Sequence, residues 1–292
     1  MSSYVLENET LIITIQSKGA ELCSIKDKGS EQEYLWNGDE KYWKRSSPIL
    51  FPAVGSCKGK KYVYDGKTYT LSQHGFARDM EFSLIKKEEN EIWFGLHSDE
   101  KTLEQYPFVF QLEIGYRLVA NKIKVMWKVK NKDRKTMYFS IGGHPAFLCP
   151  LREGEKQSDY YIGFDCDEKV EYSLVNEDGL LAYDGNILPL EDGKFKITED
   201  LFDKDALVIE NYQAHQVSLL TSEKEPYVTV DFFAPLFGIW SPAKKNAPFI
   251  CIEPWYGRCD RYDFDGTLEE REWGNKLEVG GQFDAEYTIT IE

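Results

Sequence analysis

The stretch NKIKVMWKVKN, residues 121–131, decides the fold. Ile123, Val125, Trp127 and Val129 alternate in it with lysines. A period of two places apolar side chains on one face of a β-strand and charged side chains on the other. The stretch therefore predicts an antiparallel strand with one face in the core and the other in water.

Short runs of the same kind recur on both sides of this strand, separated by clusters of Gly, Asp, Asn and Pro. Within YVYDGKTYTL (62–71), the dipeptide Asp65-Gly66 predicts a two-residue hairpin turn. The other runs are also predicted to be strands: TLIITIQ (10–16), EIWFGLHS (91–98), FVFQLEIGYRLV (108–119), QVSLLTS (216–222), YVTVDFF (227–233) and EYTITIE (286–292).

Helical signals are few. The best candidates are EKTLEQY (100–106) and TLEEREWG (267–274), and both are too short to be the main elements of an alternating βαβ fold. Many strands and few short helices predict an all-β fold, a large sandwich or barrel of antiparallel sheets. The chain has 292 residues without a Pro, Ser or Gly linker, a low-complexity run or a repeat, so one continuous domain over 1–292 is expected.

Composition limits the partners. Lys and Arg total 35 against 50 Asp and Glu, and the net charge of −15 disfavours nucleic acid and anionic membranes. The start, MSSYVLENET, does not resemble a signal peptide, and no window approaches the roughly 20 apolar residues of a membrane helix. Six scattered cysteines without a Cys-x-x-Cys pair are expected to be reduced thiols in a cytoplasmic protein.

Three polar islands stand in aromatic surroundings: LSQHGFARDM (71–80), SIGGHPAFL (140–148) and FICIEPWYGRCD (249–260). They contain His74, His144 and Glu253, and a proline after His144 and after Glu253 holds each backbone extended. Taken singly, each has an ordinary structural explanation, a histidine bonded to a carbonyl or a glutamate in a salt bridge. Together, two imidazoles and a carboxylate of raised pKa form a plausible acid/base set.

A metal site is the alternative chemistry for the same residues. Rigid metal sites usually contain a close ligand pair, and the chain has no His-x-His, no His-x-x-x-His and no two histidines within ten residues. A Gly-x-Ser-x-Gly elbow and a glycine-rich phosphate loop are also missing. We therefore expect no metal and no cofactor, with a metal-dependent sandwich enzyme as a rival hypothesis.

The islands resemble motifs of the aldose 1-epimerase (galactose mutarotase) family, in particular its LacX-like branch. The motifs occur in order, from roughly residue 5 to the C-terminus: SSPILFPAVG (46–55), HGFAR (74–78), GGHPAF (142–147) and PFICIEPWYG (248–257). The resemblance implies a β-supersandwich with a sugar cleft, which agrees with the predicted strands.

The resemblance also implies a reaction, the interconversion of sugar anomers by ring opening and reclosure. Glu253 would be the general base on the anomeric O1, His144 the general acid on the ring O5, and His74 would hold the O5 side. Arg45 and Asp205 match sugar-binding positions of the family. Trp240 and Trp255 would stack on the sugar, although one of the two is expected to be core.

The substrate stays open. The second island has Gly-His where galactose mutarotases have Asn-His, and HGFAR is shared with hexose-6-phosphate mutarotases. In those proteins arginines help to hold the phosphate, and Arg45 and Arg78 are suited to such a pocket. The acidic chain argues weakly for a free hexose, which is therefore the preferred small-molecule partner. The protein is expected to be a monomer or a homodimer. A carbohydrate-binding protein without turnover is the other alternative.

Overall fold

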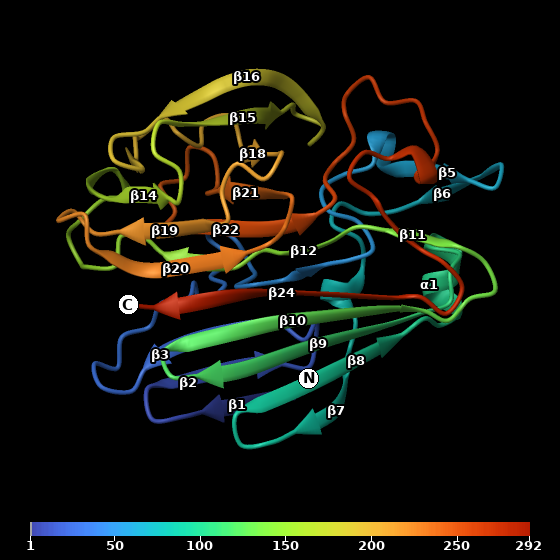
Figure 1. Cartoon of the computed structure of the whole chain (residues 1–292), viewed down its shortest axis with the longest axis horizontal. Helices are drawn as coiled ribbons and strands as arrows, with labels where there is room; N and C mark the ends of the chain where they lie inside the picture. Colours follow the sequence, from blue (N-terminus) through green and yellow to red (C-terminus); the bar gives the residue numbers. More distant parts are fainter. Residues whose placement is uncertain (1) are drawn as a thin grey trace.

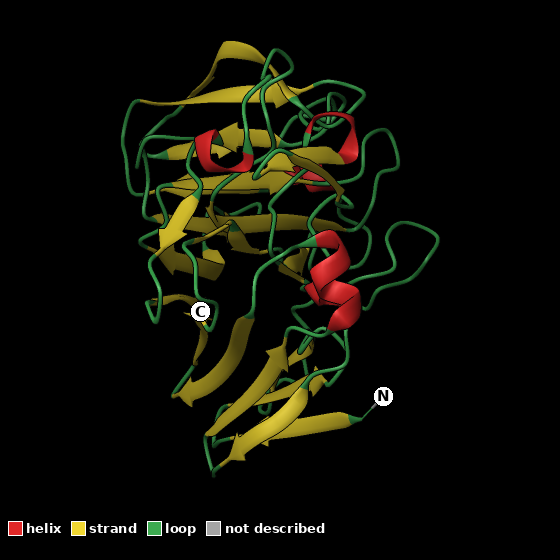
Figure 2. Ribbon diagram, turned by 90° about the vertical axis from the view of Figure 1, so that its right-hand side faces the viewer, coloured by secondary structure: helices red, strands yellow, loops and turns green. Residues whose placement is uncertain are grey.

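The computed structural model describes residues 2–292 and shows an all-β fold, as the sequence predicts. Every pairing between its named strands is antiparallel, and two large sheets of nine and eight strands dominate (Figure 1). The eight-stranded sheet occupies the upper part of Figure 1, and strands β7 to β10 of the nine-stranded sheet lie in the lower part. A view from the side shows the strands stacked in layers (Figure 2).

The nine-stranded sheet contains the deciding stretch next to its central strand, as strand β10. Ile123, Val125, Trp127 and Val129 are all buried there, so the predicted core face is confirmed. The order across the sheet is β17 (Lys194–Lys196), β14 (Tyr161–Phe164), β19 (Gln216–Leu220), β20 (Pro226–Phe232), β24 (Gln282–Ile291), β10 (Lys122–Asn131), β9 (Phe110–Val119), β8 (Glu91–His97) and β7 (Ser83–Lys87).

The eight-stranded sheet has strand β22 near its centre. The side chains of Ile250 and Ile252 on β22 join the main core, and the intervening residues face the opposite side. The order is β16 (Leu181–Pro189), β15 (Lys169–Val175), β18 (Leu207–Ile209), β21 (Leu236–Trp240), β22 (Phe249–Tyr256), β12 (Ile141–Gly143) and β4 (Ile49–Leu50), and β13 (Ala146–Leu148) also pairs with β22.

Smaller sheets complete the fold. The predicted hairpin is confirmed, because Asp65 and Gly66 both have positive φ angles, 49° and 68°, between its two strands. The remaining strands form one three-stranded and two two-stranded sheets: β1 (Ser3–Glu7), β2 (Leu11–Gln16) and β3 (Leu22–Asp27); β5 (Lys61–Tyr64) and β6 (Lys67–Thr70); β11 (Met137–Phe139) and β23 (Asn275–Leu277).

Of the two predicted helices, one is confirmed and one is wrong. The first is helix α1 (Glu100–Gln105), capped by Asp99. In the second, 267–274, only a 3₁₀ turn forms, because the backbone of Arg271 is extended while its buried side chain binds Asp260 at 2.6 Å. The 3₁₀ turns are η1 (Lys58–Lys60), η2 (Ala77–Asp79), η3 (Gln157–Asp159) and η4 (Leu268–Glu270). Within residues 2–292, no helix has the length and apolar character needed to cross a membrane.

The main hydrophobic core holds the two large sheets against each other. It includes Ile252 of β22 together with Ile123 of β10 and Tyr287 of β24. Gly143 allows close packing here, since a Cβ atom on it would lie 2.9 Å from the ring of Tyr287. The strands that hold the second and third polar islands therefore pack on the main core. A single domain over 1–292 stays a prediction.

Candidate active site

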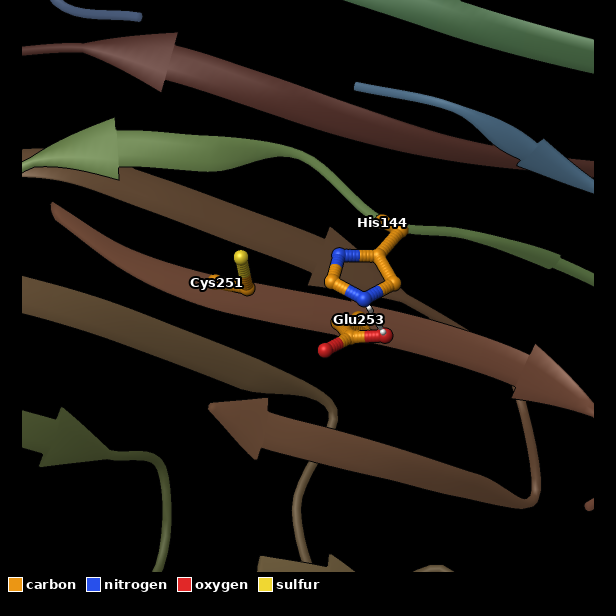
Figure 3. Close-up of side chains that lie close together, drawn as sticks. All are labelled: His144, Cys251 and Glu253. Atoms are coloured by element: carbon orange, nitrogen blue, oxygen red, sulfur yellow. Dashed lines mark ion pairs between the residues drawn. The ribbon is translucent and has the colours of Figure 1, made fainter. Parts of the chain in front are cut away.

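The register of three strands brings His144 and Glu253 together. Strands β12 and β13 pair with β22 through Gly142 opposite Trp255 and Ala146 opposite Cys251. Carried across the break between β12 and β13, this register places His144 opposite Glu253. The Nε2 atom of His144 lies 3.2 Å from Oε2 of Glu253 (Figure 3).

A cleft of about 520 Å³ lies over this pair, on the face of the eight-stranded sheet that points away from the main core. Alternation along β22 explains why, because Glu253 and Trp255 face opposite to Ile252. All eight side chains proposed from the sequence line this one cleft: Arg45, His74, Arg78, His144, Asp205, Trp240, Glu253 and Trp255. The structure thus groups these residues, and their individual roles stay proposals.

Burial controls the protonation of the central pair. His144 is 6% exposed and Glu253 is 1% exposed. Burial lowers the pKa of His144 below its usual range, and the charges of Arg78 and Arg45 lower it further. Burial raises the pKa of Glu253 well above that of an ordinary glutamate, with a contribution from the negative charge of Asp205. Both shifts favour an uncharged pair that holds one proton at neutral pH.

His74 is fixed in orientation by the segment before it in the cleft wall. The backbone N–H of Gly55 donates to Nδ1 of His74 at 3.1 Å, and the N–H of His74 donates to the carbonyl of Gly55 at 2.8 Å. Burial and Arg78 lower the pKa of His74 well below its usual value. A neutral ring that accepts at Nδ1 has its proton on Nε2, so His74 is a hydrogen-bond donor.

Three tryptophans surround the pair, and the sequence analysis missed one of them. Trp43 stacks on the ring of His144, with centroids 4.7 Å apart, and half-buried Trp240 meets the same ring edge-on at 5.4 Å. Trp255 is 6% exposed and belongs to a core cluster although it also lines the cleft. The expectation that one of the two predicted tryptophans is core fits Trp255. Trp43 lies two residues before Arg45, a predicted site residue, and this short spacing is the sequence signal that could have identified it.

The two arginines are partly engaged with protein groups. Arg45 pairs with Asp79 at 2.8 Å, and Arg78 donates to the carbonyl of Gln73 at 2.7 Å. Burial lowers the pKa of Arg78 to about 10, and the neighbouring Arg45 contributes. Within the described chain, 2–292, Nε of Arg78 has no hydrogen-bond partner. Both arginines therefore lie beside Asp79, since Nε of Arg78 is 4.0 Å from the carboxylate that Arg45 also binds.

A cysteine that the sequence analysis passed over lies beside the pair. In the part of the chain that the structure describes, His144, Cys251 and Glu253 form the one group of possible metal ligands, with ligand atoms within 4.8 Å of one another (Figure 3). Burial and the charge of Glu253 raise the pKa of the Cys251 thiol well above its usual value. Metal binding needs a thiolate, so this donor set fits a metal poorly.

Comparisons with known proteins place the chain among sugar-epimerase relatives. Residues 2–266 match the family model described as aldose 1-epimerase. The chromosomal and plasmid forms of Protein LacX from Lactococcus lactis subsp. lactis are each 34% identical over 295 residues, which covers 98% of this chain and of the relative.

Solved structures agree with the sequence relatives. A galactose mutarotase related enzyme from Lactobacillus acidophilus has a TM-score of 0.92 and 35% identity over 100% of this chain and 97% of its own. A galactose mutarotase-like protein from Lactobacillus casei ATCC 334 has a TM-score of 0.91 and 29% identity, with both chains covered completely. The supersandwich fold expected from the motifs is that of these structures.

Proposed function

Because the chain belongs to the aldose 1-epimerase family, we propose that it is an isomerase that interconverts the α and β anomers of a free hexose. The observation that carries the proposal is the His144–Glu253 pair, 3.2 Å apart at the buried end of the cleft. Groups of opposite proton-transfer role, adjacent and shielded from water, are what this reaction requires.

The geometry of the substrate favours neighbouring acid and base. The O1 hydroxyl and the ring O5 of an aldopyranose are both bonded to C1, so the two groups that act on them must stand side by side. Glu253 takes the proton from O1 while His144 gives a proton to O5, the C1–O5 bond breaks, and the C1 end rotates. Reclosure reverses both transfers. Oε2 of Glu253 makes no hydrogen bond within residues 2–292, which leaves it available for O1.

The pair keeps a constant charge through this cycle. Before ring opening its one proton is on His144, and afterwards the pair again holds one proton, now on Glu253. A buried site with little water gains from this constancy, since no net charge has to be created in a region of low dielectric. The pKa shifts favour the resting proton on Glu253, so the proton passes across the 3.2 Å between the two residues to His144 before ring opening.

The other cleft residues orient the sugar. His74 donates from Nε2 toward the O5 side, while Arg45 and Asp205 bind hydroxyl groups as donor and acceptor. Trp43 and Trp240 give apolar surface for the C–H face of the ring. No step in this scheme requires a metal or a cofactor.

A free hexose is preferred over a phosphorylated one because Arg45 is already paired with Asp79. The alternative, hexose-6-phosphate 1-epimerisation, is favoured by one observation: half-buried Arg78 lines the cleft, and its Nε makes no hydrogen bond within residues 2–292 although it lies 4.0 Å from Asp79. All six cysteines are free, which supports a reducing, cytoplasmic setting for either reaction.

Polarimetry of freshly dissolved α-D-glucose and α-D-galactose, and NMR of anomer exchange for their 6-phosphates, tests the proposal. We expect the protein to accelerate equilibration of a free hexose well above the spontaneous rate. Acceleration of the 6-phosphates alone would show that the substrate is a hexose 6-phosphate and not a free hexose. Sugar binding without acceleration of any anomerisation would instead identify a carbohydrate-binding protein.

A further inference from the structure

Glu21 is a buried carboxylate that stands immediately before strand β3 and is not among the residues that line the cleft. Its side chain is in a residue only 9% exposed. The Oε1 atom accepts the backbone N–H of Ser46 at 2.7 Å and that of Ser47 at 3.0 Å. Burying a carboxyl group costs free energy unless hydrogen bonds or opposite charges compensate. The proposed reaction does not use Glu21, so its burial calls for a different role.

The two serines follow a loop whose side chains reach the cleft. Trp43 stacks on the ring of His144, and Arg45 lines the cleft wall. Residues 43–47 belong to no helix or strand. No ladder of a sheet sets the position of this loop, so hydrogen bonds from other segments have to do so.

Hydrogen bonds from three other segments hold the loop. Nε1 of Trp36 donates to the carbonyl of Trp43 at 2.8 Å, and the N–H of Ala146 donates to the carbonyl of Ser46 at 2.9 Å. Ala146 stands two residues after the imidazole of the central pair, so this bond ties the loop to the segment of that imidazole. Glu21 supplies the third anchor, and a carboxylate forms stronger hydrogen bonds with N–H groups than a neutral acceptor does.

The backbone before Glu21 also meets the segment of Arg78. The N–H of Gly19 donates to the carbonyl of Met80 at 2.7 Å, and a Cβ atom on Gly19 would lie 2.8 Å from the carbonyl oxygen of Arg78. Burial raises the pKa of the Glu21 carboxyl, and its two backbone hydrogen bonds and the charges of Arg45 and Arg78 oppose that rise. Glu21 thus stands where wall segments of the cleft meet.

We propose that Glu21 is a positioning residue that acts through the backbone of 46–47 to hold Trp43 over His144. The inference rests on the proposed function, because it assigns to Glu21 the geometry of that same site. Glu21 itself touches no reacting atom. Without its carboxylate, two buried N–H groups lose their acceptor, and the loop leaves the place in which the indole covers the imidazole.

The first test separates reach from charge. Glu21→Gln keeps the length of the side chain and an oxygen acceptor, whereas Glu21→Asp keeps the charge and shortens the side chain by one carbon. For glucose or galactose, whichever is turned over faster, kcat/KM should stay close to that of the wild type in Glu21→Gln. It should fall by about tenfold or more in Glu21→Asp and in Glu21→Ala, because the loop is misplaced. If Glu21→Ala does not fold, Glu21→Asp decides the test. A larger loss in Glu21→Gln than in Glu21→Asp would overturn the inference.

The pH profile gives a readout that lost stability does not imitate. Uncovering the imidazole raises the pKa of His144, so in Glu21→Asp and Glu21→Ala the fall of kcat/KM at low pH should move upward by about one pH unit. The titratable and charged groups around the imidazole remain the same in these variants: Arg45, His74, Arg78, Cys251 and Glu253. An unmoved fall in both variants would contradict a role through Trp43.

Glu91→Ala is the matched control. Glu91 is 8% exposed, lies on β8 outside the cleft, and accepts hydrogen bonds from Trp93 and Arg117. Its loss should lower Tm, as the loss of Glu21 does, while the pH profile and kcat/KM at 25 °C stay unchanged. If Glu91→Ala shifts the profile as far as Glu21→Ala does, the shift reflects general loss of stability, and the inference fails.

A double-mutant cycle tests the route through the indole. We expect kcat/KM of Glu21→Ala combined with Trp43→Ala to lie within about twofold of the poorer single variant, since both changes remove one contact. Effects that multiply in full would show that Glu21 acts elsewhere.

A structural measurement separates failure of this inference from failure of the proposed function. The chain has four histidines, so NMR can follow the ring protons of His144, which the stacked indole shifts by its ring current. The shift should persist in Glu21→Gln and decrease toward that of Trp43→Ala in Glu21→Asp and Glu21→Ala. This result would support the positioning role even in a protein that turns over no sugar. An unchanged shift in Glu21→Asp and Glu21→Ala would overturn it.

Discussion

The indole ring of Trp43 lies stacked on the imidazole of His144, with the ring centroids 4.7 Å apart and the planes 28° from parallel. This contact covers one face of the imidazole and contributes to the burial that lowers the pKa of His144. A side chain outside the recognised motifs thus takes part in setting the protonation of the central pair.

The pH profile should be flat through neutrality. Activity requires one proton on the pair, and a second is added only when pH falls through the lowered pKa of His144. The last proton is lost only when pH rises through the raised pKa of Glu253. We expect kcat/KM to stay constant from about pH 5 to pH 8, where an unperturbed histidine titrates. A limb near pH 6.5 would contradict this protonation scheme.

Replacing Trp43 should move the fall of kcat/KM at low pH, the acid limb of the pH profile. Trp43→Ala exposes the imidazole, so the pKa of His144 rises toward its ordinary value and the fall of kcat/KM should shift upward by about one pH unit. Trp43→Phe keeps an aromatic cover and should shift the limb less. The measurement is kcat/KM against pH for the three proteins, and an unmoved limb in Trp43→Ala would argue that this ring does not control the imidazole.

Glu253→Gln should remove the base but keep the shape. We expect kcat to fall by about two to four orders of magnitude while sugar affinity changes little, because glutamine still forms hydrogen bonds but cannot take a proton. His144→Asn should act similarly, and the double variant should be little worse than either one, since the two residues work as one relay. Near-normal turnover by Glu253→Gln would reject it as the base.

Arg78→Ala should distinguish free from phosphorylated sugars. For a free-hexose enzyme we expect KM for glucose and glucose 6-phosphate to change by similar factors. The control is Arg152→Ala, which removes an equal charge from a residue outside the cleft. A rise in KM of about tenfold or more for the 6-phosphate alone would show that Arg78 holds a phosphate.

Chelation should leave activity unchanged. The proton relay uses only side chains, and the raised pKa of Cys251 keeps that thiol protonated beside the pair. We expect full activity after treatment with EDTA and dialysis, and in Cys251→Ser. Stoichiometric zinc, iron or manganese in the purified protein, with activity lost on its removal and restored on its return, would make this a metal enzyme.

The sequence predicts the strands well because their signal is local. The alternation in 121–131 and the Asp65-Gly66 turn depend only on neighbouring residues, and both are confirmed. The helix expected at 267–274 fails because Asp260, which lies outside that segment, holds the buried side chain of Arg271. Tertiary pairing there overrides local propensity.

The candidate site likewise contains some residues that motifs in the sequence predict and others that only the fold brings together. Motifs place His74, His144 and Glu253 in polar islands, and the cleft indeed contains all three. Trp43 and Cys251 join them only through the fold, one by stacking from a loop and the other by pointing to the same face of β22. No spacing in the chain encodes the stacking of Trp43 on His144, whereas the two-residue spacing of Cys251 and Glu253 on one strand was an available signal for the thiol.

The register that sets His144 opposite Glu253 separates the chemistry of the site from its selectivity. The spacing of acid and base follows from hydrogen-bonded strands, whereas turns and loops, 176–179 and 203–205, line a second cavity that adjoins the cleft. In relatives, changes in these loops can therefore alter which sugars bind while the reaction stays the same. A one-residue insertion between Gly142 and Ala146 is a different matter, because it would disrupt the alignment that brings the imidazole to the carboxylate.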